Sequence, residues 1–247
     1  MLSRPQTVRK HLELDRLVLV VAQQDLRAAS IKYATLEEKL SSVEMEKFKA
    51  FKDGPSSWGF AVGRLITREV ISQIYGIKPS EVSIQIQESG RPRIEYPGGL
   101  GVSISHSGPF VALALSSDGE CGVDIESSEA LPACLPIHDR FFSTQEKLWL
   151  EEAGNRLDKG QRFLRLWTRK EAYLKATGQG LAGLSSQLDF AGLPRCNESE
   201  GRTAPFQLNG FWVFDVVGSS DYCLSACVNW KPSTVDTISL QIGALEI

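Results

Sequence analysis

The stretch Gly122-Val123-Asp124-Ile125-Glu126 alternates apolar and acidic residues, and this pattern predicts a β-strand. Alternate side chains of a strand share a face, so Val123 and Ile125 are expected in the core and Asp124 and Glu126 on the other side. Two carboxylates about 7 Å apart along a strand can bind one hard cation such as Mg²⁺ together with substrate phosphates. The alternative interpretation is a strand end with two solvated carboxylates. The stretch therefore predicts a strand and a candidate metal site.

A second segment, residues 167–175, predicts a helix with polar side chains along one edge. Trp167, Glu171 and Lys175 follow at intervals of four residues and so share a helix face. Lys170 is expected with them along the edge of an apolar stripe, where a cleft could form. The alternative is an exposed Glu–Lys pair with the tryptophan packed in the core.

Two short stretches before the acidic strand carry groups that can bind phosphate. Residues 102–108 alternate as a strand and place His106 between serines, and both residue types can donate hydrogen bonds to phosphate oxygens. Further upstream, Gly90-Arg91-Pro92 offers a guanidinium whose fork of donors matches a phosphate. Taken separately, the first stretch is equally a strand-to-turn corner and the second only a turn.

The order of expected elements is strand, helices, strands, and then helices and strands again. This order is typical of the α+β class, in two halves of similar make-up with a joint near residues 125–135. Thr35 with Glu38 and Ser143 with Glu146 form possible capping boxes at helix starts. Helices are expected at about 35–51, 58–75, 144–154 and 162–177, strands at about 17–22, 82–86, 102–105, 110–116, 122–125, 211–217, 222–228 and 237–242, a connector at Pro132 and Pro136, and a polar loop at 197–204.

Composition narrows the class of protein. The 247 residues are 42% hydrophobic and 23% charged, which excludes a disordered chain. The formal net charge of −3 gives no general attraction to nucleic acid or an acidic membrane. The apolar run at residues 17–22 is far shorter than the roughly 20 residues that cross a bilayer. Five cysteines without a CxxC motif argue against a disulfide framework, so a cytoplasmic protein is expected, with no membrane or nucleic acid as partner.

Together, the order and spacing of the motifs resemble the 4′-phosphopantetheinyl transferases of the surfactin-synthetase-activating type. The motifs span residues 90–175 and read Gly-Arg-Pro, Ser-Ile-Ser-His-Ser, Gly-Val-Asp-Ile-Glu, Phe-Phe-Ser-x-x-Glu and Trp-Thr-x-Lys-Glu-Ala-x-x-Lys. The resemblance implies a pseudo-dimer of two similar α+β halves on one chain, with the active site in the cleft between them. The halves would be residues 1–125 and 126–247, and the internal pseudo-symmetry makes a monomer sufficient.

The resemblance also implies an activity. The family transfers the 4′-phosphopantetheine arm of coenzyme A to a serine of an apo acyl, polyketide or peptidyl carrier protein, with Mg²⁺, and releases adenosine 3′,5′-bisphosphate. By their place in the motifs, the metal ligands would be Asp124, Glu126 and Glu171. Glu171, Lys175 and His106 would be catalytic, with either Glu171 or a metal-bound water as the base. The residues that would bind coenzyme A are Arg91, Ser105, His106, Lys170 and Lys175.

The chain departs from the family pattern at one position. The helix after the first break usually carries an arginine where this chain has Gly59, so other basic residues would have to bind the 3′-phosphate of coenzyme A. The candidates are Lys47, Lys49, Lys52 and Arg64. Glu146 is explained by the capping box with Ser143 and could also lie near the site.

Two other functions stay open on the sequence. The chain could be an inactive relative that binds carrier proteins without modifying them, but the intact set of Asp124, Glu126 and Glu171 argues against this. It could also be another Mg²⁺-dependent phosphoryl or nucleotidyl transferase, although it has neither a Walker A motif nor a kinase motif set. The leading prediction is an active phosphopantetheinyl transferase.

Overall fold

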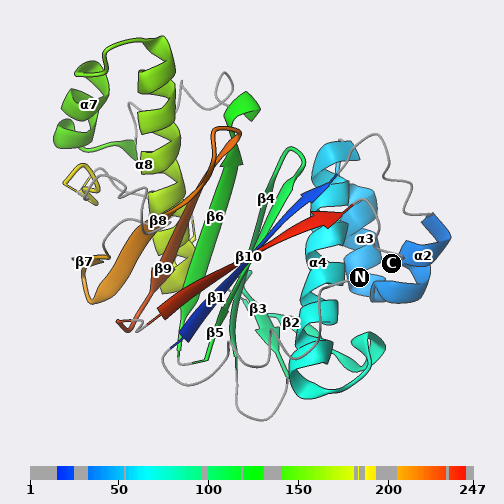
Figure 1. Ribbon diagram of the computed structural model, residues 1–247. Coiled ribbons are helices and arrows are strands. Elements are labelled where there is room, and N and C mark those ends of the chain that lie inside the picture. Colours follow the sequence, from blue (N-terminus) through cyan, green and yellow to red (C-terminus); the bar gives the residue numbers. More distant parts are fainter. Residues whose placement is uncertain are drawn as a thin grey trace.

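The computed structural model describes residues 16–24, 33–52, 54–88, 90–95, 100–117, 119–130, 141–180, 183, 187–192, 205–231 and 234–242. These residues form both helices and β-sheets, so the predicted α+β class is confirmed. Two four-stranded sheets lie between two long helices (Figure 1). Among the described residues, no helix is long and apolar enough to cross a membrane.

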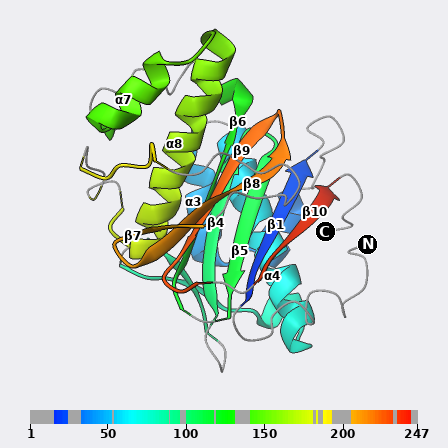
Figure 2. The ribbon, with the colours of Figure 1, turned by 60° about the vertical axis from the view of Figure 1, so that its left-hand side comes forward.

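The first sheet consists of β10 (Thr234–Ile242), β1 (Arg16–Gln24), β5 (Phe110–Ser116) and β4 (Gly101–Ser107), in that order (Figure 2). β1 runs parallel to β10 and antiparallel to β5, and β4 is antiparallel to β5. The two central strands are apolar runs that are buried on both faces. Strands covered on both sides read as continuous hydrophobic sequence rather than as an alternation.

The second sheet consists of β6 (Cys121–Ser127), β9 (Tyr222–Val228), β8 (Phe211–Ser219) and β7 (Phe206–Leu208), all antiparallel. β6 is therefore an edge strand of this sheet, and β4 is an edge strand of the first sheet. The strand predicted at 122–125 is confirmed in β6. Val123 and Ile125 are fully buried between the two sheets, as the alternation predicts.

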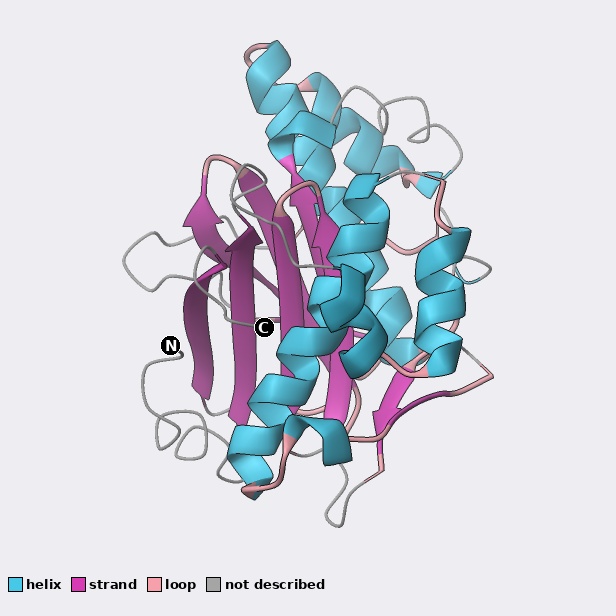
Figure 3. Cartoon of the chain, turned by 90° about the vertical axis from the view of Figure 1, so that its right-hand side faces the viewer, coloured by secondary structure: helices cyan, strands magenta, loops and turns pink. Residues whose placement is uncertain are grey.

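Two 22-residue helices cover the outer faces of the sheets. α4 (Gly54–Tyr75) packs on the first sheet, on the side that faces the viewer in Figure 3, and α8 (Arg156–Thr177) packs on the second (Figure 1). One hydrophobic cluster fills each helix–sheet interface, and a third lies between the sheets. The smaller elements are α2 (Tyr33–Lys39), α3 (Ser42–Ala50), α7 (Thr144–Glu151), the 3₁₀ turns η1 (Pro79–Glu81) and η2 (Ser128–Ala130), and the hairpin of β2 (Ile84–Ile86) and β3 (Pro92–Ile94).

Several predicted boundaries were wrong. The helix expected at 35–51 is two helices, and the capping box belongs to Ser41 and Glu44 at the start of α3, since α2 already begins at Tyr33. The capping box at Ser143 and Glu146 is confirmed at the start of α7. α8 begins at Arg156 instead of 162, and the short strands β3 and β7 were not predicted. The connector at Pro132 and Pro136 and the loop at 197–204 lie outside the described residues.

The division of the strands between the two sheets does not coincide with the predicted boundary at residue 125. β6 begins at Cys121 and pairs with β9 of the second sheet. β10, near the other end of the chain, pairs with β1 of the first sheet. The chain therefore returns to the first sheet after it has built the second.

Candidate active site

Gly122 brings helix α8 into direct contact with strand β6. A Cβ atom at this position would lie 2.0 Å from the carbonyl oxygen of Ala172 and 2.6 Å from the backbone nitrogen of Ala176. Only a glycine leaves room for the helix backbone at this distance. The close approach places Glu171 and Lys175 of α8 beside the carboxylates of β6. Gly122 is therefore required for these side chains to form one site.

Lys175 and Asp124 form the central ion pair of the site. The Lys175 ammonium lies 2.7 Å from Oδ1 of Asp124 and donates a second hydrogen bond, of 3.1 Å, to the carbonyl of Val123. The Lys175 side chain is 31% exposed, whereas that of Asp124 is 6% exposed. The pair thus joins α8 to β6 and keeps one side open to solvent.

Strand β4 supplies two hydroxyl groups to the same carboxylates. Ser105 donates to Oδ1 of Asp124 at 2.8 Å, and Ser107 donates to Oε2 of Glu126 at 2.6 Å. The Trp167 side chain of α8 also acts on Glu126, where it opposes the rise in pKa that burial causes. The sequence analysis assigned no role to Ser107, although the alternation of Ser-Ile-Ser-His-Ser already places Ser105 and Ser107 on one face.

Burial raises the pKa of all three carboxyl groups, and the Asp124 charge adds repulsion at Glu126 and Glu171. Burial, reinforced by the Asp124 charge, raises the pKa of Glu126 to about 7, against hydrogen bonds from Ser107 and Trp167 and the Lys175 charge. The same two causes raise the pKa of Glu171 to about 7, opposed by the charge of Lys175. Burial also raises the pKa of Asp124, while Lys175 and Ser105 act in the opposite direction. The three groups therefore share a region in which negative charge is under-compensated.

The donor set fits a divalent cation. Oδ2 of Asp124 and Oε1 of Glu171 are buried and have no hydrogen-bond partner. When all three carboxyls are ionised, Lys175 offsets one negative charge and leaves two. As placed, no three His, Cys, Asp or Glu side chains of the described residues converge on one metal position. Mg²⁺ needs only one or two protein carboxylates, because water and substrate phosphates complete its octahedron.

His106 lies on the other face of β4, against helix α4. A Cβ atom at Gly59 would lie 2.7 Å from Nδ1 of His106, so this glycine makes room for the imidazole. Ser105, by contrast, faces Asp124 of β6. Ser105 and His106 therefore point to opposite faces of β4, as consecutive strand residues do, and their contacts with coenzyme A stay predictions.

Arg91 contacts the C-terminal end of α8. Its guanidinium donates to the backbone carbonyls of Lys175 and Ala176 and pairs with the Glu120 carboxylate. A cation at this end of a helix interacts favourably with the helix dipole and with carbonyls that have no intrahelical partner. Arg91 therefore holds the turn that carries Lys175, a contact that the sequence analysis did not predict.

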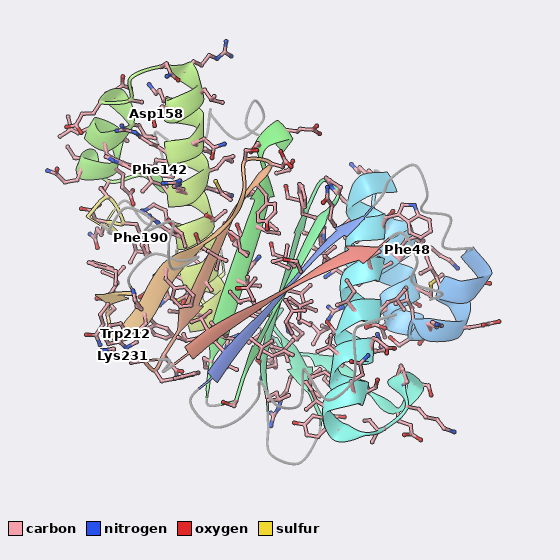
Figure 4. All side chains as sticks on the ribbon, viewed as in Figure 1. Phe48, Phe142, Asp158, Phe190, Trp212 and Lys231 are labelled. Carbon is pink, nitrogen blue, oxygen red and sulfur yellow. The ribbon has the colours of Figure 1, made fainter. Side chains whose placement is uncertain are left out.

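Lys170 does not lie with Lys175, and its predicted binding of coenzyme A stays a prediction that its burial does not favour. Its side chain is 0% exposed, its ammonium is 3.0 Å from Oε2 of Glu146, and it donates to the Leu188 carbonyl. The rings of Phe142 and Phe190, labelled in Figure 4, have centroids 5.7 and 5.3 Å from the ammonium. Five residues of an α-helix leave about 140° between two side chains, so the two lysines face different surroundings.

Glu146 has the structural role that the capping box predicts. Its Oε2 accepts from the backbone N–H of Ser143, and its Oε1 accepts from that of Phe190. The side chain is fully buried. Every contact of this carboxylate is to α7, α8 or the segment at Phe190, so it is not a member of the Asp124 group.

The basic candidates for a 3′-phosphate lie around α3 and α4. The Arg64 guanidinium lies 3.6 Å from Glu44 and stacks on the Phe60 ring, and it is buried. Lys47 lies over the same ring at 5.3 Å from its centroid. Lys49 and Lys52 are exposed. A role for these four residues stays a prediction.

The comparisons with known proteins agree with the motifs. A family model described as the 4′-phosphopantetheinyl transferase superfamily matches residues 120–227, and one described as 4′-phosphopantetheinyl transferase, N-terminal, matches residues 24–118. Together the two models cover most of the chain, and they meet immediately before β6.

Curated relatives carry the same description. The 4′-phosphopantetheinyl transferase HetI of Nostoc is 28% identical over 80% of this chain and 83% of its own length. Two Bacillus subtilis proteins, a 4′-phosphopantetheinyl transferase and the 4′-phosphopantetheinyl transferase Sfp, are 31% and 33% identical over 58% of this chain. The chain spans 62% of the length of each of these two Bacillus proteins. On the motifs, the two family models and these relatives, the chain belongs to the 4′-phosphopantetheinyl transferase superfamily.

Proposed function

We propose that this protein transfers the 4′-phosphopantetheine group of coenzyme A to a serine hydroxyl of an apo acyl, polyketide or peptidyl carrier protein, with Mg²⁺. The observation that carries the proposal is the group of Asp124, Glu126, Glu171 and Lys175, with its two unpartnered buried oxygens. The family supports the substrate class. The site chemistry supports a reaction in which phosphate charge must be neutralised.

Asp124, Glu126 and Glu171 would hold the metal ion. Their excess of negative charge and their raised pKa values support this assignment, since a bound cation would relieve the repulsion. When bound, Mg²⁺ supplies neutralisation of the charge on the pyrophosphate of coenzyme A. Lys175, half-buried at the same place, would neutralise a further phosphate oxygen.

The chemical step is a displacement at phosphorus. The carrier serine oxygen forms a bond to the phosphorus of the pantetheine phosphate, and the bond from that phosphorus to the bridging oxygen of the pyrophosphate breaks. Adenosine 3′,5′-bisphosphate leaves with the bond's electron pair. The serine proton passes to Glu171, directly or through a water molecule, because a serine hydroxyl is a weak nucleophile without a base in reach.

His106, Ser105 and Arg91 take different parts in the proposal. His106 would contact a coenzyme A phosphate from the α4 side of β4, where Gly59 makes room for its ring. Ser105 and Arg91 would act through the residues they bind, Asp124 and the last turn of α8. Direct coenzyme A contacts of these two residues stay predictions.

We also propose that the chain is a pseudo-dimer of two α+β halves with the active site between them. Each half would contain one four-stranded sheet and one covering helix of 22 residues. Strand pairing favours a boundary just before β6, near residue 120, over the division into 1–125 and 126–247. With both halves on one chain, a monomer is sufficient, and the three described cysteines, which are free thiols, favour the cytoplasm.

The experiment is a transfer assay followed by mass spectrometry. The protein is incubated with coenzyme A, Mg²⁺ and several apo carrier proteins, beside a matched Asp124→Asn variant. We expect one phosphopantetheine mass on the carrier with the wild type and none with the variant. Absence of that mass on every carrier would contradict the proposal. A carrier that binds unmodified would favour the binding module, and the mass of another phosphoryl or nucleotidyl group would favour a different transferase.

A further inference from the structure

Three serines alternate along β4, and all three hydroxyls face strand β6. Ser103 accepts a hydrogen bond of 3.0 Å from the backbone N–H of Val123, and Ser107 accepts one of 3.1 Å from that of Ser127. Ser105, between them, donates to Asp124. We call Ser103, Ser105 and Ser107 the hydroxyl seam.

The seam stands where two sheet edges meet without backbone pairing. β4 ends the first sheet and β6 ends the second, and the two strands belong to no common ladder. An edge strand leaves backbone donors that need partners when they are buried. The serine hydroxyls satisfy two of these donors on β6, so the seam replaces part of a strand–strand ladder by side chains.

Two members of the seam also donate to carboxylates. Ser107 donates to Glu126 at 2.6 Å while accepting from Ser127, so both functions of its hydroxyl are used and its orientation is fixed. Oδ1 of Asp124 accepts from both Ser105 and Lys175, while Oδ2 is buried without a partner. The donors on one oxygen thus determine which oxygen stays available.

We propose that Ser105 and Ser107 are positioning residues that orient Asp124 and Glu126 for a divalent cation. The first sheet would then set the metal affinity of carboxylates that belong to the second. Hydrogen bonds to a ligating carboxylate fix its rotamer, and their loss typically weakens metal binding by about 10–100-fold. The inference rests on the proposed function, because the cation is the one required for transfer.

The test compares Ser105→Ala and Ser107→Ala with the matched control Ser103→Ala. Ser103 lies on the same strand and face, is buried, and accepts its hydrogen bond from a backbone N–H instead of donating to a carboxylate. Mg²⁺ is titrated calorimetrically into each full-length protein in the presence of saturating coenzyme A, and the melting temperature is recorded. We expect about 10-fold weaker Mg²⁺ binding or more in the first two variants, and binding within about twofold of wild type in the control.

Threonine variants distinguish the loss of the hydroxyl hydrogen bond to the carboxylate from a change in side-chain packing. Ser105→Thr and Ser107→Thr keep the hydroxyl and suit a strand, so each should recover most of the Mg²⁺ affinity lost in the alanine variant. The KM for Mg²⁺ should follow the measured affinity in every variant. Wild-type affinity in both alanine variants, or equal loss in Ser103→Ala, would overturn the inference. A wild type that neither binds Mg²⁺ nor modifies a carrier would overturn the proposed function instead.

Discussion

Helix α8 carries two lysine–carboxylate pairs that have the same chemistry and opposite surroundings. Lys170 and Glu146 are both fully buried, and each has further hydrogen bonds to backbone groups. Lys175 is 31% exposed, and its partner Asp124 retains an oxygen without a hydrogen bond. The first pair is complete within the protein. The second is incomplete, and this incompleteness distinguishes a binding site from a structural contact.

The comparison teaches that one sequence motif can contain both a structural residue and a residue of the candidate active site. Trp-Thr-x-Lys-Glu-Ala-x-x-Lys places both lysines within one short segment, but the helix turns them to different neighbours. One anchors α8 to α7, and the other faces β6. Substitutions at the two pairs should therefore separate stability from activity.

The largest effect is expected from Lys170→Met, which leaves the Glu146 carboxylate buried without its charge partner. Removal of one member of a buried pair costs about 3–5 kcal/mol of unfolding free energy. Urea denaturation measures this loss, and Lys175→Met is the matched control. The control should lose less, since the Lys175 side chain is 31% exposed and its ammonium is only partly desolvated by folding. An equal loss of unfolding free energy in both variants would mean that the two ion pairs contribute equally to stability.

Asp124→Asn should have the opposite effect to Lys170→Met, with a loss of activity and little loss of stability. The variant keeps the size of the side chain and an oxygen for Ser105, but it loses the charge that would hold the metal ion. We expect kcat/KM for coenzyme A to fall on the order of 10³-fold, or about 4 kcal/mol, with little change in stability. Glu146→Gln, the matched change in the other pair, should lower stability and leave kcat per folded molecule near that of the wild type. Retained activity in Asp124→Asn would refute the metal-site assignment.

Mg²⁺ binding should stabilise the folded protein through the site at Asp124 and Lys175, and not through the pair of Lys170 and Glu146. At a Mg²⁺ concentration 100-fold above Kd, a ligand that binds only the folded state adds about 2.7 kcal/mol. Thermal unfolding with Mg²⁺ and with EDTA should show this shift in the wild type and in Lys170→Met, but not in Asp124→Asn. A shift of equal size in Asp124→Asn would place the cation elsewhere.

The smallest effect is expected from Ser143, which lies beside the buried pair of Lys170 and Glu146. Ser143 caps α7, and its hydroxyl accepts from the backbone N–H of Glu146. Ser143→Ala should cost about 1 kcal/mol of unfolding free energy, the usual value of an N-cap, with transfer unchanged. Ser41→Ala, the same change in the capping box of α3, provides the comparison. A much larger cost at Ser143 would show that its second hydrogen bond, donated to Oδ1 of Asp189 at 3.1 Å, also contributes to stability.

Local patterns predicted much of the fold and part of the site. The alternation at 122–126 correctly indicated a strand with Val123 and Ile125 in the core, because burial on one face imposes a period of two. The start of α8 was missed because its first turns are polar and exposed, so no apolar period marks them.

Other features depend on contacts between distant segments. The close approach of α8 to β6 requires Gly122, but nothing near this residue in the sequence names Ala172 as its neighbour. The burial of Lys170 against Glu146 depends on the packing of α7 on α8, which helix periodicity alone does not reveal. Ser107 was overlooked because its role depends on β4 lying beside β6, which strand patterns alone do not reveal.

The parallel pairing of β1 with β10 has a consequence for synthesis. The ribosome makes β1 and β10 at opposite ends of the described residues, with β4 and β5 between them, so the first sheet lacks one strand until β10 has been translated. β1 is meanwhile a hydrophobic strand with one unpaired edge, a state prone to non-native association. Non-local pairing also slows folding, because loop closure must precede the contacts that repay it. The exposed edge of β1 should therefore be covered only after β10 leaves the exit tunnel.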